Sequence, residues 1–406
     1  MKNDSEFTAE FTAEMLRKAK DNLMYFTNKP DIVFSRGEGS YLWDTEGNRY
    51  IDMIAGWAVC CLGHTPPVVA DALNRQAALL VNPSPSFYNV PAIEFAEILC
   101  GISCMDKVFF INSGAEANES AVKLARKYGQ KYKNGAYEII TAWNSFHGRT
   151  LAMMAATGKK YWDPLFPPRP EGFVRVNYND IEDLRAAVSP NTCAIMLELI
   201  QGEGGVIVGD KDYIKQVREI CDSNDIVFII DEVQTGLGRL GRMFGYEAYD
   251  IEPDVMTLAK GIGGGFPLSA MLAKDKFCCF NIGDVGGTYC GTPLAAAVGK
   301  AVVEEIIRSN LVDTVKRNGD YFTERLLALR DKNIGICGVR GMGLLLAAEL
   351  ADESAERVKD ICVDNYLLIN APNKKCLRFM PALNISADEI DGALAVLERA
   401  LLEVYS

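Results

Sequence analysis

The chain has 406 residues, more than the roughly 250 to 300 that a single hydrophobic core usually serves, so we expect one large domain and one smaller domain. Its formal net charge of −12 argues against nucleic acid and anionic membranes as partners, because neutralising phosphates requires clustered Lys and Arg. No segment approaches the roughly 20 apolar residues of a membrane span, and the amino terminus lacks the apolar core of a signal peptide. We therefore expect a cytoplasmic protein that binds small molecules and other subunits.

Cysteine and histidine usage argues against disulfides and metal ions. The 12 cysteines are spread over a long chain, mostly in apolar runs, and are predicted to be reduced, buried thiols. No CxxC pair occurs, and the two histidines are His64 and His147. We therefore expect no structural zinc site and no other bound metal.

The first part of the chain divides into three patterns. Residues 1–22 are predicted to form an exposed amphipathic helix, and residues 32–54 alternate apolar and polar residues around the turns GEGS and DTEGN, which predicts a small antiparallel meander. Between residues 55 and 290, short apolar runs alternate with helical periodicity, which predicts a mainly parallel sheet covered on both faces. These runs are KVFFI, YEIITA, FVRV, TCAIMLELI, DIVFIIDE, VMTLA and SAMLA.

The carboxyl-terminal part is predicted to leave the large domain and to build a smaller one. It begins with the pattern of two long helices that break near Ser309 and Asn310. Strand candidates follow at LLLAAEL, LLIN and CLRFM, with helical patterns between and after them. The expected division is an amino-terminal part of the small domain (1–54), a large domain (55–290), connecting helices (291–330) and the carboxyl-terminal part of the small α/β domain (331–406).

The stretch DIVFIIDEVQTGLGRLG, residues 225–241, combines a buried strand with two acids and a glycine-rich turn. The strand resembles the magnesium-binding strand of a P-loop ATPase, but no GxxxxGK[ST] window occurs in the chain. GLGRLG matches the dinucleotide pattern, yet it runs into Gly245 and Pro253 instead of opening a helix. Because successive strand residues face opposite ways, Asp231 and Glu232 cannot both address one ligand. A purely structural role for either acid stays open.

A second stretch, FFINSGAEANESAVKLARKYG, passes from an apolar strand into a strong helix pattern. The unpaired amides at a helix start form an anion site, and Gly114 lets the backbone come close to the anion. Ser113 fits this site and an ordinary helix cap equally well. No lysine lies in the loop, which favours one phosphate monoester over a nucleotide triphosphate.

Further motifs place charged side chains next to strands. Arg149 in FHGRT can clamp a carboxylate or lie on the surface at a helix start, while His147 by itself is interpreted as structural. IQGEGG presents Glu203 on a glycine-rich turn. The glycines are explained equally well if they only form the turn. Arg378 lies in the apolar strand CLRFM, where an unpaired guanidinium is costly, so it should meet an acid or a ligand carboxylate. Lys260 precedes the glycine run of AKGIGGGFP, which fits a phosphate loop, a turn or a reactive buried amine.

Together these motifs resemble the class III aminotransferases, which use pyridoxal 5′-phosphate (PLP) on the aspartate aminotransferase fold. The resemblance runs from about Gly37 to the carboxyl end, with NSGAEANESAVKLAR, FHGRT, IQGEGG, DEVQTGLGRLG and PDVMTLAKGIGGGFPLSAML in family order and spacing. It implies an α/β fold of PLP fold type I, with a mainly parallel seven-stranded sheet in the large domain and a small domain built from both termini. Within the class, the chain is most similar to the acetylornithine group, close to the ornithine and succinylornithine enzymes.

The resemblance also implies the cofactor contacts. Lys260 would hold PLP covalently and, when freed, would move a proton between the substrate carbon and the cofactor, because burial and a nearby cation lower its pKa. Asp231 would pair with the pyridine nitrogen and keep it protonated. The other implied contacts are Phe146 stacked on the ring, Gln234 on the phenolic oxygen, Ser113, Gly114 and Ala115 on the phosphate, and Thr288 on the phosphate from the other subunit of a homodimer.

Two carboxylate patterns in the substrates follow from the same resemblance. Arg149 would bind the carboxylate far from the reacting carbon in both half-reactions. Arg378 would pair with Glu203 while an ω-amine donor is bound, and would be released to hold the carboxylate beside the ketone of 2-oxoglutarate. The implied reaction moves the δ-amino group of N-acetyl-L-ornithine to 2-oxoglutarate, giving N-acetyl-L-glutamate 5-semialdehyde and L-glutamate in arginine biosynthesis. Ornithine, succinylornithine and 4-aminobutyrate remain alternative donors, and a nucleotide-binding ATPase is the alternative from another class.

Three segments depart from the pattern of the acetylornithine enzymes. Residues 84–88 read SPSFY where that group usually has SNLFY, and VGGTYCGTPL carries Cys290 and Thr292 where it has Gly and Asn. The glutamate strand reads ELIQGEGG in place of the commoner EPIQGEGG. These changes leave the implied cofactor contacts in place and bear on the identity of the donor.

Overall fold

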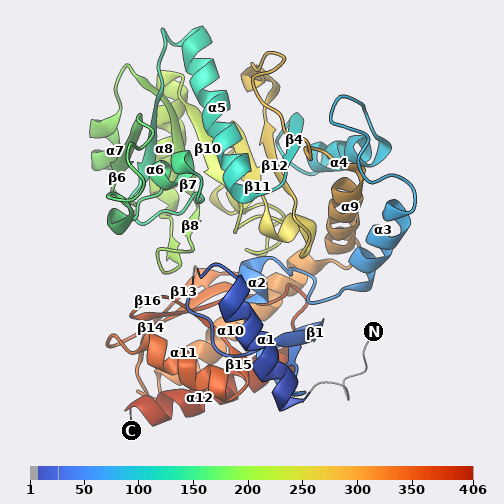
Figure 1. Ribbon diagram of the computed structural model, residues 1–406. Helices are drawn as coiled ribbons and strands as arrows, with labels where there is room; N and C mark the ends of the chain where they lie inside the picture. The colour runs from blue at the N-terminus through green and yellow to red at the C-terminus, as the bar shows by residue number, and fades with distance from the viewer. Residues whose placement is uncertain (1–7, 26, 406) are drawn as a thin grey trace.

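The computed structural model describes residues 8–25 and 27–405, and the chain builds two stacked lobes (Figure 1). The upper lobe in that view contains the largest sheet with its helices, and the lower lobe contains strands and helices from both ends of the chain. The predicted amino-terminal helix is confirmed as α1 (Ala9–Asn22), which is capped by the hydroxyl of Thr8. The start of that prediction, residues 1–7, lies outside the described residues.

The large sheet is formed by the seven apolar runs that the sequence marks as strands. They are β4 (Lys107–Ile111), β5 (Glu138–Ala142), β6 (Phe173–Val176), β7 (Thr192–Glu198), β10 (Val227–Asp231), β11 (Val255–Leu258) and β12 (Ser269–Ala273). Their spatial order is β4-β12-β11-β10-β7-β5-β6, and each neighbouring pair is parallel except the two pairs that involve β12. The prediction of a mainly parallel, seven-stranded sheet is confirmed.

Helices cover both faces of this sheet. Neighbouring strand residues point to opposite sides, and because the strands are mainly apolar, both faces have to be buried. The helices of the upper lobe include α3 (Pro67–Ala77), α4 (Val90–Gly101), α5 (Gly114–Tyr132), α6 (Leu151–Ala156), α7 (Ile181–Ala187) and α8 (Lys211–Asn224). In β10, Val227 and Ile229 belong to a buried cluster that contains residues of α5. Phe228 and Ile230 belong to a second cluster, which contains residues of α8. The side chain of Asp231, one position after Ile230, therefore faces α5.

The lower lobe joins the two ends of the chain in one sheet. The predicted meander is confirmed as β1 (Phe34–Glu38), β2 (Tyr41–Asp44) and β3 (Arg49–Asp52), and β15 (Leu367–Leu368) pairs in parallel with β3. A second sheet contains β13 (Ile336–Met342), β14 (Leu345–Leu350), β17 (Cys376–Phe379) and β16 (Asn370–Asn373), in that order. The sequence does not predict β13, because Gly338, Arg340 and Gly341 interrupt its apolar pattern.

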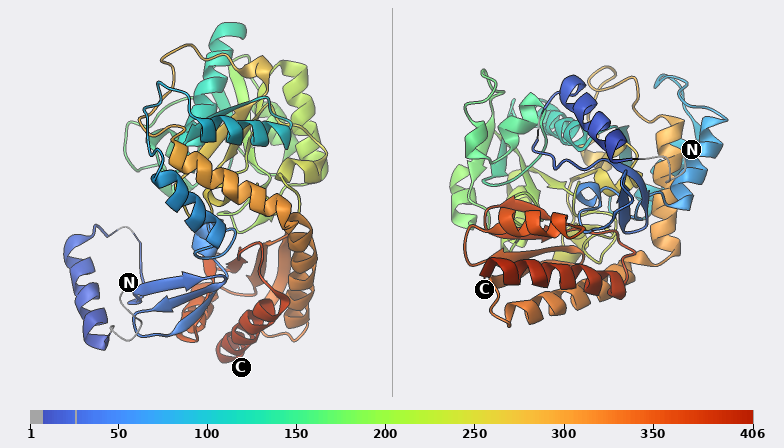
Figure 2. Two further views of the ribbon diagram at one scale, coloured as in Figure 1. Left: turned by 90° about the vertical axis from the view of Figure 1, so that its right-hand side faces the viewer. Right: turned by 60° about the horizontal axis from the view of Figure 1, so that its bottom comes forward.

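Two long helices connect the lobes. Helix α9 (Pro293–Arg308) packs against α3 and α4, whereas α10 (Leu311–Arg330) packs against β13 and β14. Figure 2 shows α9 leading from the upper lobe into α10 of the lower lobe. Asn310 between them has a φ of 48°, a left-handed conformation that asparagine adopts more readily than most residues. The predicted break near Ser309 and Asn310 is confirmed, and α11 (Ala355–Asp364) and α12 (Ala387–Tyr405) complete the lower lobe.

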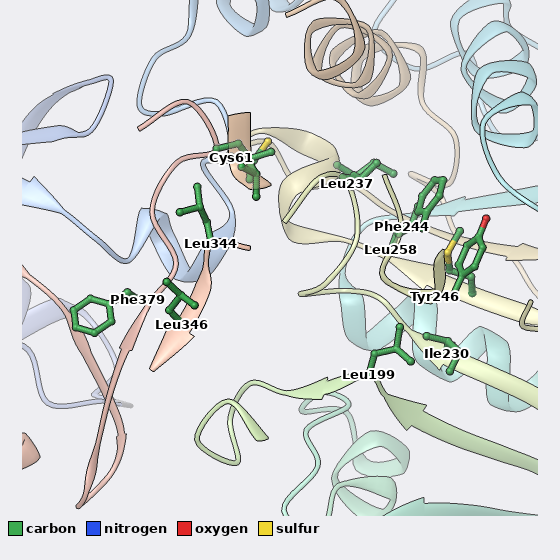
Figure 3. Close-up of a cluster of buried hydrophobic side chains, with 14 of the residues drawn as sticks. Cys61, Leu199, Ile230, Leu237, Phe244, Tyr246, Leu258, Leu344, Leu346 and Phe379 are labelled. Atoms are coloured by element: carbon green, nitrogen blue, oxygen red, sulfur yellow. The ribbon is translucent and has the colours of Figure 1, made fainter. Parts of the chain in front are cut away.

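One buried cluster passes through both lobes (Figure 3). Ile230 and Leu258 belong to the upper sheet, whereas Leu346 and Phe379 belong to strands of the lower lobe. Cys61 lies between the two groups in the close-up. The lobes therefore share a core, and the four-part division of the chain stays a prediction.

The remaining elements are short. They are α2 (Ala55–Ala58), β8 (Ile200–Gln201), β9 (Ile207–Val208) and the 3-10 turns η2 (Lys160–Trp162), η3 (Gly245–Tyr249), η4 (Lys260–Gly263) and η5 (Asp275–Phe277). Across residues 8–25 and 27–405, no helix is long and apolar enough to cross a membrane, and no cluster of His, Cys, Asp and Glu side chains is suited to a metal ion. The 12 cysteines are free thiols, of which six are buried and four are partly buried; Cys278 and Cys337 are exposed, so the prediction of burial is wrong for these two.

Candidate active site

A cavity of about 450 Å³ opens where the parallel strands of the large sheet end. Its walls come from the segments that follow β4, β5, β7, β10 and β11, the edge at which open α/β sheets bind ligands. Segments that are far apart in the sequence therefore meet around one space. The predicted site residues that line it are Ser113, Gly114, Ala115, Phe146, Arg149, Glu203, Asp231, Gln234 and Lys260.

Lys260 follows the end of β11 and lines the cavity as the first residue of η4. Its φ of 47° is left-handed backbone, which is uncommon for a residue other than glycine and concentrates at functional sites. Burial lowers the pKa of its amine to about 8, while Glu203 opposes this shift and Arg378 adds to it. About a tenth of the amine is therefore unprotonated at pH 7, far more than of an exposed lysine, which suits a nucleophile or a proton carrier.

The glycines after Lys260 form a turn. Gly264 and Gly265 have φ values of 53° and 115°, which side-chain-bearing residues rarely adopt. A Cβ atom on Gly264 would lie 2.8 Å from Cγ2 of Val302, in α9. The run therefore provides turn geometry and close packing against α9, and the phosphate-loop interpretation of this motif is not supported.

Asp231 is the last residue of β10 and is 4% exposed. Its Oδ2 lies 2.8 Å from Nδ1 of His147 and accepts a 2.7 Å hydrogen bond from Nδ2 of Asn118, while its Oδ1 accepts one from the Val233 amide. Thr257 fixes Asn118 in turn, because its hydroxyl donates to the Asn118 amide oxygen at 2.6 Å. This network holds the carboxylate in one orientation at the cavity wall.

The hydrogen bond to Asp231 also affects His147. Burial disfavours the imidazolium, but the hydrogen bond and the charge of Asp231 outweigh that effect and raise the pKa of His147. His147, which is also among the residues that line the cavity, therefore supports the carboxylate through this hydrogen bond, and its interpretation as a structural residue stays a prediction. The sequence does not predict Asn118, because it lies within a helical pattern whose polar residues are expected at the surface.

Glu232 lies on the opposite side of β10 from Asp231. Its carboxylate accepts hydrogen bonds from the amides of Gly245 and Tyr246 at 2.7 and 2.8 Å, and burial raises its pKa to about 7. It does not belong to the residues that line the cavity in the described chain. The expectation that the two acids cannot both address one ligand is confirmed, and Glu232 fixes the turn after the strand.

Helix α5 points its amino-terminal end at the cavity. The Ser113 hydroxyl accepts from the Glu116 amide at 3.3 Å and donates to the Glu116 carboxylate at 2.9 Å, which is the geometry of a helix cap. A Cβ atom on Gly114 would lie 2.9 Å from Cγ1 of Val233, so the position accommodates glycine alone without a shift. Because Gly114 and Ala115, the first residues of α5, line the cavity, the helix start is suited to bind an anion such as a phosphate.

Aromatic rings and cations cluster near α6, where Phe146 and Arg149 line the cavity and Trp162 and Lys159 lie next to them. Phe146 and Trp162 make an edge-to-face contact with ring centroids 5.9 Å apart. The guanidinium of Arg149 lies 5.3 Å from the Trp162 ring, and the Lys159 amine lies 5.1 Å from the Phe146 ring. Arg149 is exposed, lines the cavity and directly precedes the cap of α6. Its position is therefore compatible with a carboxylate clamp and with a surface arginine at a helix start.

Arg378 is 1% exposed and meets an acid, as the sequence predicts. Its Nη2 donates to Oε1 of Glu203 at 2.7 Å, and its other nitrogens donate to Asn370 and Gln234 at 3.0 and 3.4 Å. Lys159 lies on the far side of the glutamate, with Nζ 3.6 Å from Oε2. Burial alone would raise the pKa of Glu203, but Arg378 and then Lys159 lower it to about 2. The pair is therefore charged at neutral pH.

Glu198, which the sequence LELIQGEGGVIV presents together with Glu203, is a further acid in the cavity wall. It is 7% exposed, and its Oε2 accepts a 2.9 Å hydrogen bond from the amide of Phe146. Burial raises its pKa to about 7, while the charge of His147 acts against that rise. This hydrogen bond fixes the backbone that carries the Phe146 ring.

Thr288 is exposed and does not belong to the lining of the cavity in the described part of one chain. Its carbonyl accepts a 3.1 Å hydrogen bond from Asn82, and the carbonyl of Gly291 accepts one from Asn89 at 2.9 Å. The two segments SPSFY and TYCGTPL, which differ from the usual sequences of the acetylornithine enzymes, therefore lie side by side. Exposed apolar side chains surround them, at Phe87, Tyr88, Val90, Ile93 and Tyr289.

The cavity has the features that bind PLP. A helix start suits the phosphate, a buried carboxylate suits a protonated ring nitrogen, an aromatic side chain suits the ring, and a lysine with a lowered pKa suits the aldehyde. A family model described as "Aminotransferase class-III" matches residues 25–401. The protein belongs to the class III aminotransferases, and PLP is its cofactor. Membership in this family leaves no support for the ATPase alternative.

Proteins of similar sequence and fold agree with this class. The chain is 49% identical to acetylornithine aminotransferase 2 of Bordetella bronchiseptica over 93% of its length and 98% of the relative. Its fold matches a structure of ornithine aminotransferase from Toxoplasma gondii, in which PLP partly occupies the active site, with a TM-score of 0.93, 30% identity, and coverage of 98% and 96% of the two chains. It also matches acetylornithine aminotransferase of Elizabethkingia anophelis with a TM-score of 0.87, 33% identity, and coverage of 97% and 99%.

Proposed function

We propose that this aminotransferase moves the δ-amino group of N-acetyl-L-ornithine to 2-oxoglutarate, giving N-acetyl-L-glutamate 5-semialdehyde and L-glutamate, a step of arginine biosynthesis. Relatives called acetylornithine aminotransferase at 41–49% identity support this donor. The observation that carries the proposal is the 2.7 Å pair between Arg378, which is buried, and Glu203, which lines the cavity. An arginine with a detachable acidic partner suits an enzyme whose two substrates differ in their carboxylates.

The proposed cofactor contacts follow the geometry of the cavity. PLP, when bound, supplies an electron sink for the negative charge that develops at the substrate carbon bearing the amine. Lys260 holds the cofactor and then carries the proton to and from that carbon. Asp231, oriented by its hydrogen bonds, keeps the pyridine nitrogen protonated. Phe146 stacks on the ring, Gln234 binds the phenolic oxygen, and Ser113, Gly114 and Ala115 bind the phosphate.

The two arginines divide the work of recognising carboxylates. Arg149, exposed at the cavity wall, binds the carboxylate far from the reacting carbon of either substrate. While an ω-amine donor is bound, Glu203 neutralises Arg378, so the donor's chain does not meet a buried unpaired cation. When 2-oxoglutarate or glutamate binds, Arg378 leaves Glu203 and holds the carboxylate next to the reacting carbon.

We further propose a homodimer whose partner subunit supplies Thr288 to the phosphate site. Thr288 lies on an exposed segment beside exposed apolar side chains, including Phe87, Tyr88 and Tyr289. Exposed aromatic side chains of this kind are typical of subunit interfaces. Mass measurement by light scattering checks the assembly, and Thr288→Ala checks the contact through a weaker affinity for PLP.

The donor is tested with single half-reactions. The holoenzyme is mixed separately with N-acetylornithine, ornithine, succinylornithine and 4-aminobutyrate, and the loss of the cofactor's visible absorbance is followed by stopped flow. We expect kcat/KM to be at least about tenfold higher for N-acetylornithine than for the other three amines, a difference of about 1.4 kcal/mol in transition-state binding. A higher value for any of the others would assign that amine as the donor instead.

A further inference from the structure

The carboxylate of Glu203 lies between two cations that contact different oxygen atoms. Arg378 donates to Oε1 at 2.7 Å, and the Lys159 amine lies 3.6 Å from Oε2. The side chains of Arg378, Lys159 and Glu203 are 1%, 15% and 27% exposed, so water screens this group of charges only in part. Glu203 can therefore lose its contact with one cation and keep its contact with the other.

Lys159 is held in place by its surroundings. It follows helix α6 and directly precedes η2, and its amine lies 5.1 Å from the ring of Phe146 and 5.3 Å from that of Trp162. Trp162 is 5% exposed, so this aromatic surface is itself fixed by packing. In the described chain, Lys159 does not belong to the residues that line the cavity, whereas Glu203 does. The charge of Lys159 therefore reaches a bound substrate through Glu203.

We propose that Lys159 is a positioning residue that keeps Glu203 paired when a substrate carboxylate takes Arg378. This inference rests on the proposed function, in which Arg378 alternates between Glu203 and the substrate. A partly buried carboxylate without a partner is costly, and that cost would otherwise fall on the half-reaction that needs Arg378 free. With Lys159 in place, Glu203 still has one cationic partner after Arg378 has moved to the substrate. Without Lys159, it would have none.

The proposal predicts an effect on one class of substrate. Removing the charge of Lys159 leaves the pair between Glu203 and Arg378 intact, so ω-amine donors should react nearly as before. Glutamate and 2-oxoglutarate must still separate that pair, and Glu203 is then left unpaired. We expect kcat/KM for these two substrates to fall about tenfold in Lys159→Met, because a partly buried carboxylate is costly to leave without a partner.

The test compares three variants of the holoenzyme. Lys159→Met removes the charge and keeps much of the apolar stem, and Lys159→Arg restores the charge. Lys160→Met is the matched control, because Lys160 is the neighbouring lysine, is exposed, and stacks on Trp143 instead of contacting Glu203. Half-reaction kinetics are measured with glutamate and with N-acetylornithine. Calorimetry with glutarate, a dicarboxylate that has neither amine nor ketone, measures carboxylate binding without any reaction.

The expected result is a loss with glutamate and a weaker affinity for glutarate in Lys159→Met, with N-acetylornithine unchanged, recovery in Lys159→Arg, and wild-type behaviour in Lys160→Met. Equal losses with both substrates would overturn the proposal and show that Lys159 binds the carboxylate far from the reacting carbon, beside Arg149. Unchanged kinetics and glutarate affinity would overturn it as well. If wild-type enzyme reacts with no ω-amine, the proposed function itself fails, and this inference falls with it.

Discussion

Asp231 and His147 form a buried pair in which Oδ2 of the carboxylate lies 2.8 Å from Nδ1 of the imidazole. Asn118 donates to the same oxygen at 2.7 Å, so the donors converge on one side of the carboxylate. The chain's other histidine, His64, makes a matching contact of 2.8 Å with Asp52, outside the cavity. One histidine–aspartate pair therefore lies at the cofactor cavity and the other lies away from it, so the second pair can serve as a control for the first.

Replacing His147 with leucine should weaken the orientation and charge of Asp231. We expect the affinity for PLP and kcat/KM to fall by about 10- to 100-fold, since a hydrogen bond to a charged group contributes roughly 1.5 to 3 kcal/mol. Fluorescence titration with PLP and steady-state kinetics measure the two effects. His64→Leu should reduce the melting temperature and leave the affinity for PLP unchanged. A similar loss of PLP affinity in both variants would mean that His147 acts through general stability.

Gly114→Ala should disturb the anion-binding start of α5. The new Cβ would lie 2.9 Å from Cγ1 of Val233, so the helix start has to shift away from the cavity wall. We expect the dissociation constants of PLP and of inorganic phosphate to rise about tenfold or more, as two calorimetric titrations of the apoprotein can determine. Gly101→Ala is the control, because a Cβ on Gly101, at the end of α4, meets nothing within 4 Å. Unaltered phosphate binding in Gly114→Ala would place the phosphate elsewhere.

Much of the upper lobe is predictable because its information is local. Runs such as KVFFI and DIVFIIDE are apolar throughout, since both faces of their strands are buried, and the structure forms a strand at each of the seven. The pairing of Arg378 with an acid is also predictable, because an isolated guanidinium in an apolar strand is costly. In these cases, a single segment carries the physical reason for its own structure.

Other features depend on which segments meet, and the sequence does not reveal that directly. Asn118 looks like a polar position of a helix until the fold brings it to Asp231, which is 113 positions away. Lys159 has the appearance of a surface lysine, and its contact with Glu203 depends on the turn after α6 lying against the turn after β8. Strand β13 is obscured by its glycines and Arg340 and forms through pairing with β14.

Glu203→Ala should impair the half-reaction of the ω-amine donor more than that of glutamate. This is the opposite of the effect expected for Lys159→Met. Without the acid, Arg378 stays available for the carboxylate of glutamate, while an ω-amine donor now faces a buried, unneutralised cation. We expect kcat/KM to fall about tenfold or more for N-acetylornithine and to change by less than about threefold for glutamate. Stopped-flow half-reactions with the two substrates measure both values. Equal losses would contradict the proposed exchange of partners.

The pH dependence of Lys260 follows from its surroundings. Burial, with the help of Arg378, lowers the pKa of this amine from 10.5 to about 8 in the protein without cofactor. The reactive form is the free amine, so the rate of its reaction with PLP in the apoprotein should rise about tenfold per pH unit below pH 8 and level off above it. Trapping the product with borohydride at short times, followed by peptide mass spectrometry, measures this rate at Lys260 alone.

The exposed lysines of the same apoprotein provide the control for that profile. Lys107 is exposed, and its contact with Asp275 raises its pKa, so its labelling should keep increasing beyond pH 10 in the same samples. Because the two lysines experience the same reagent, a change in the chemistry of PLP with pH would alter both profiles together. A profile for Lys260 that still rises at pH 10 would show that its amine is solvated like a surface lysine, and would remove the physical basis for its proposed role as proton carrier.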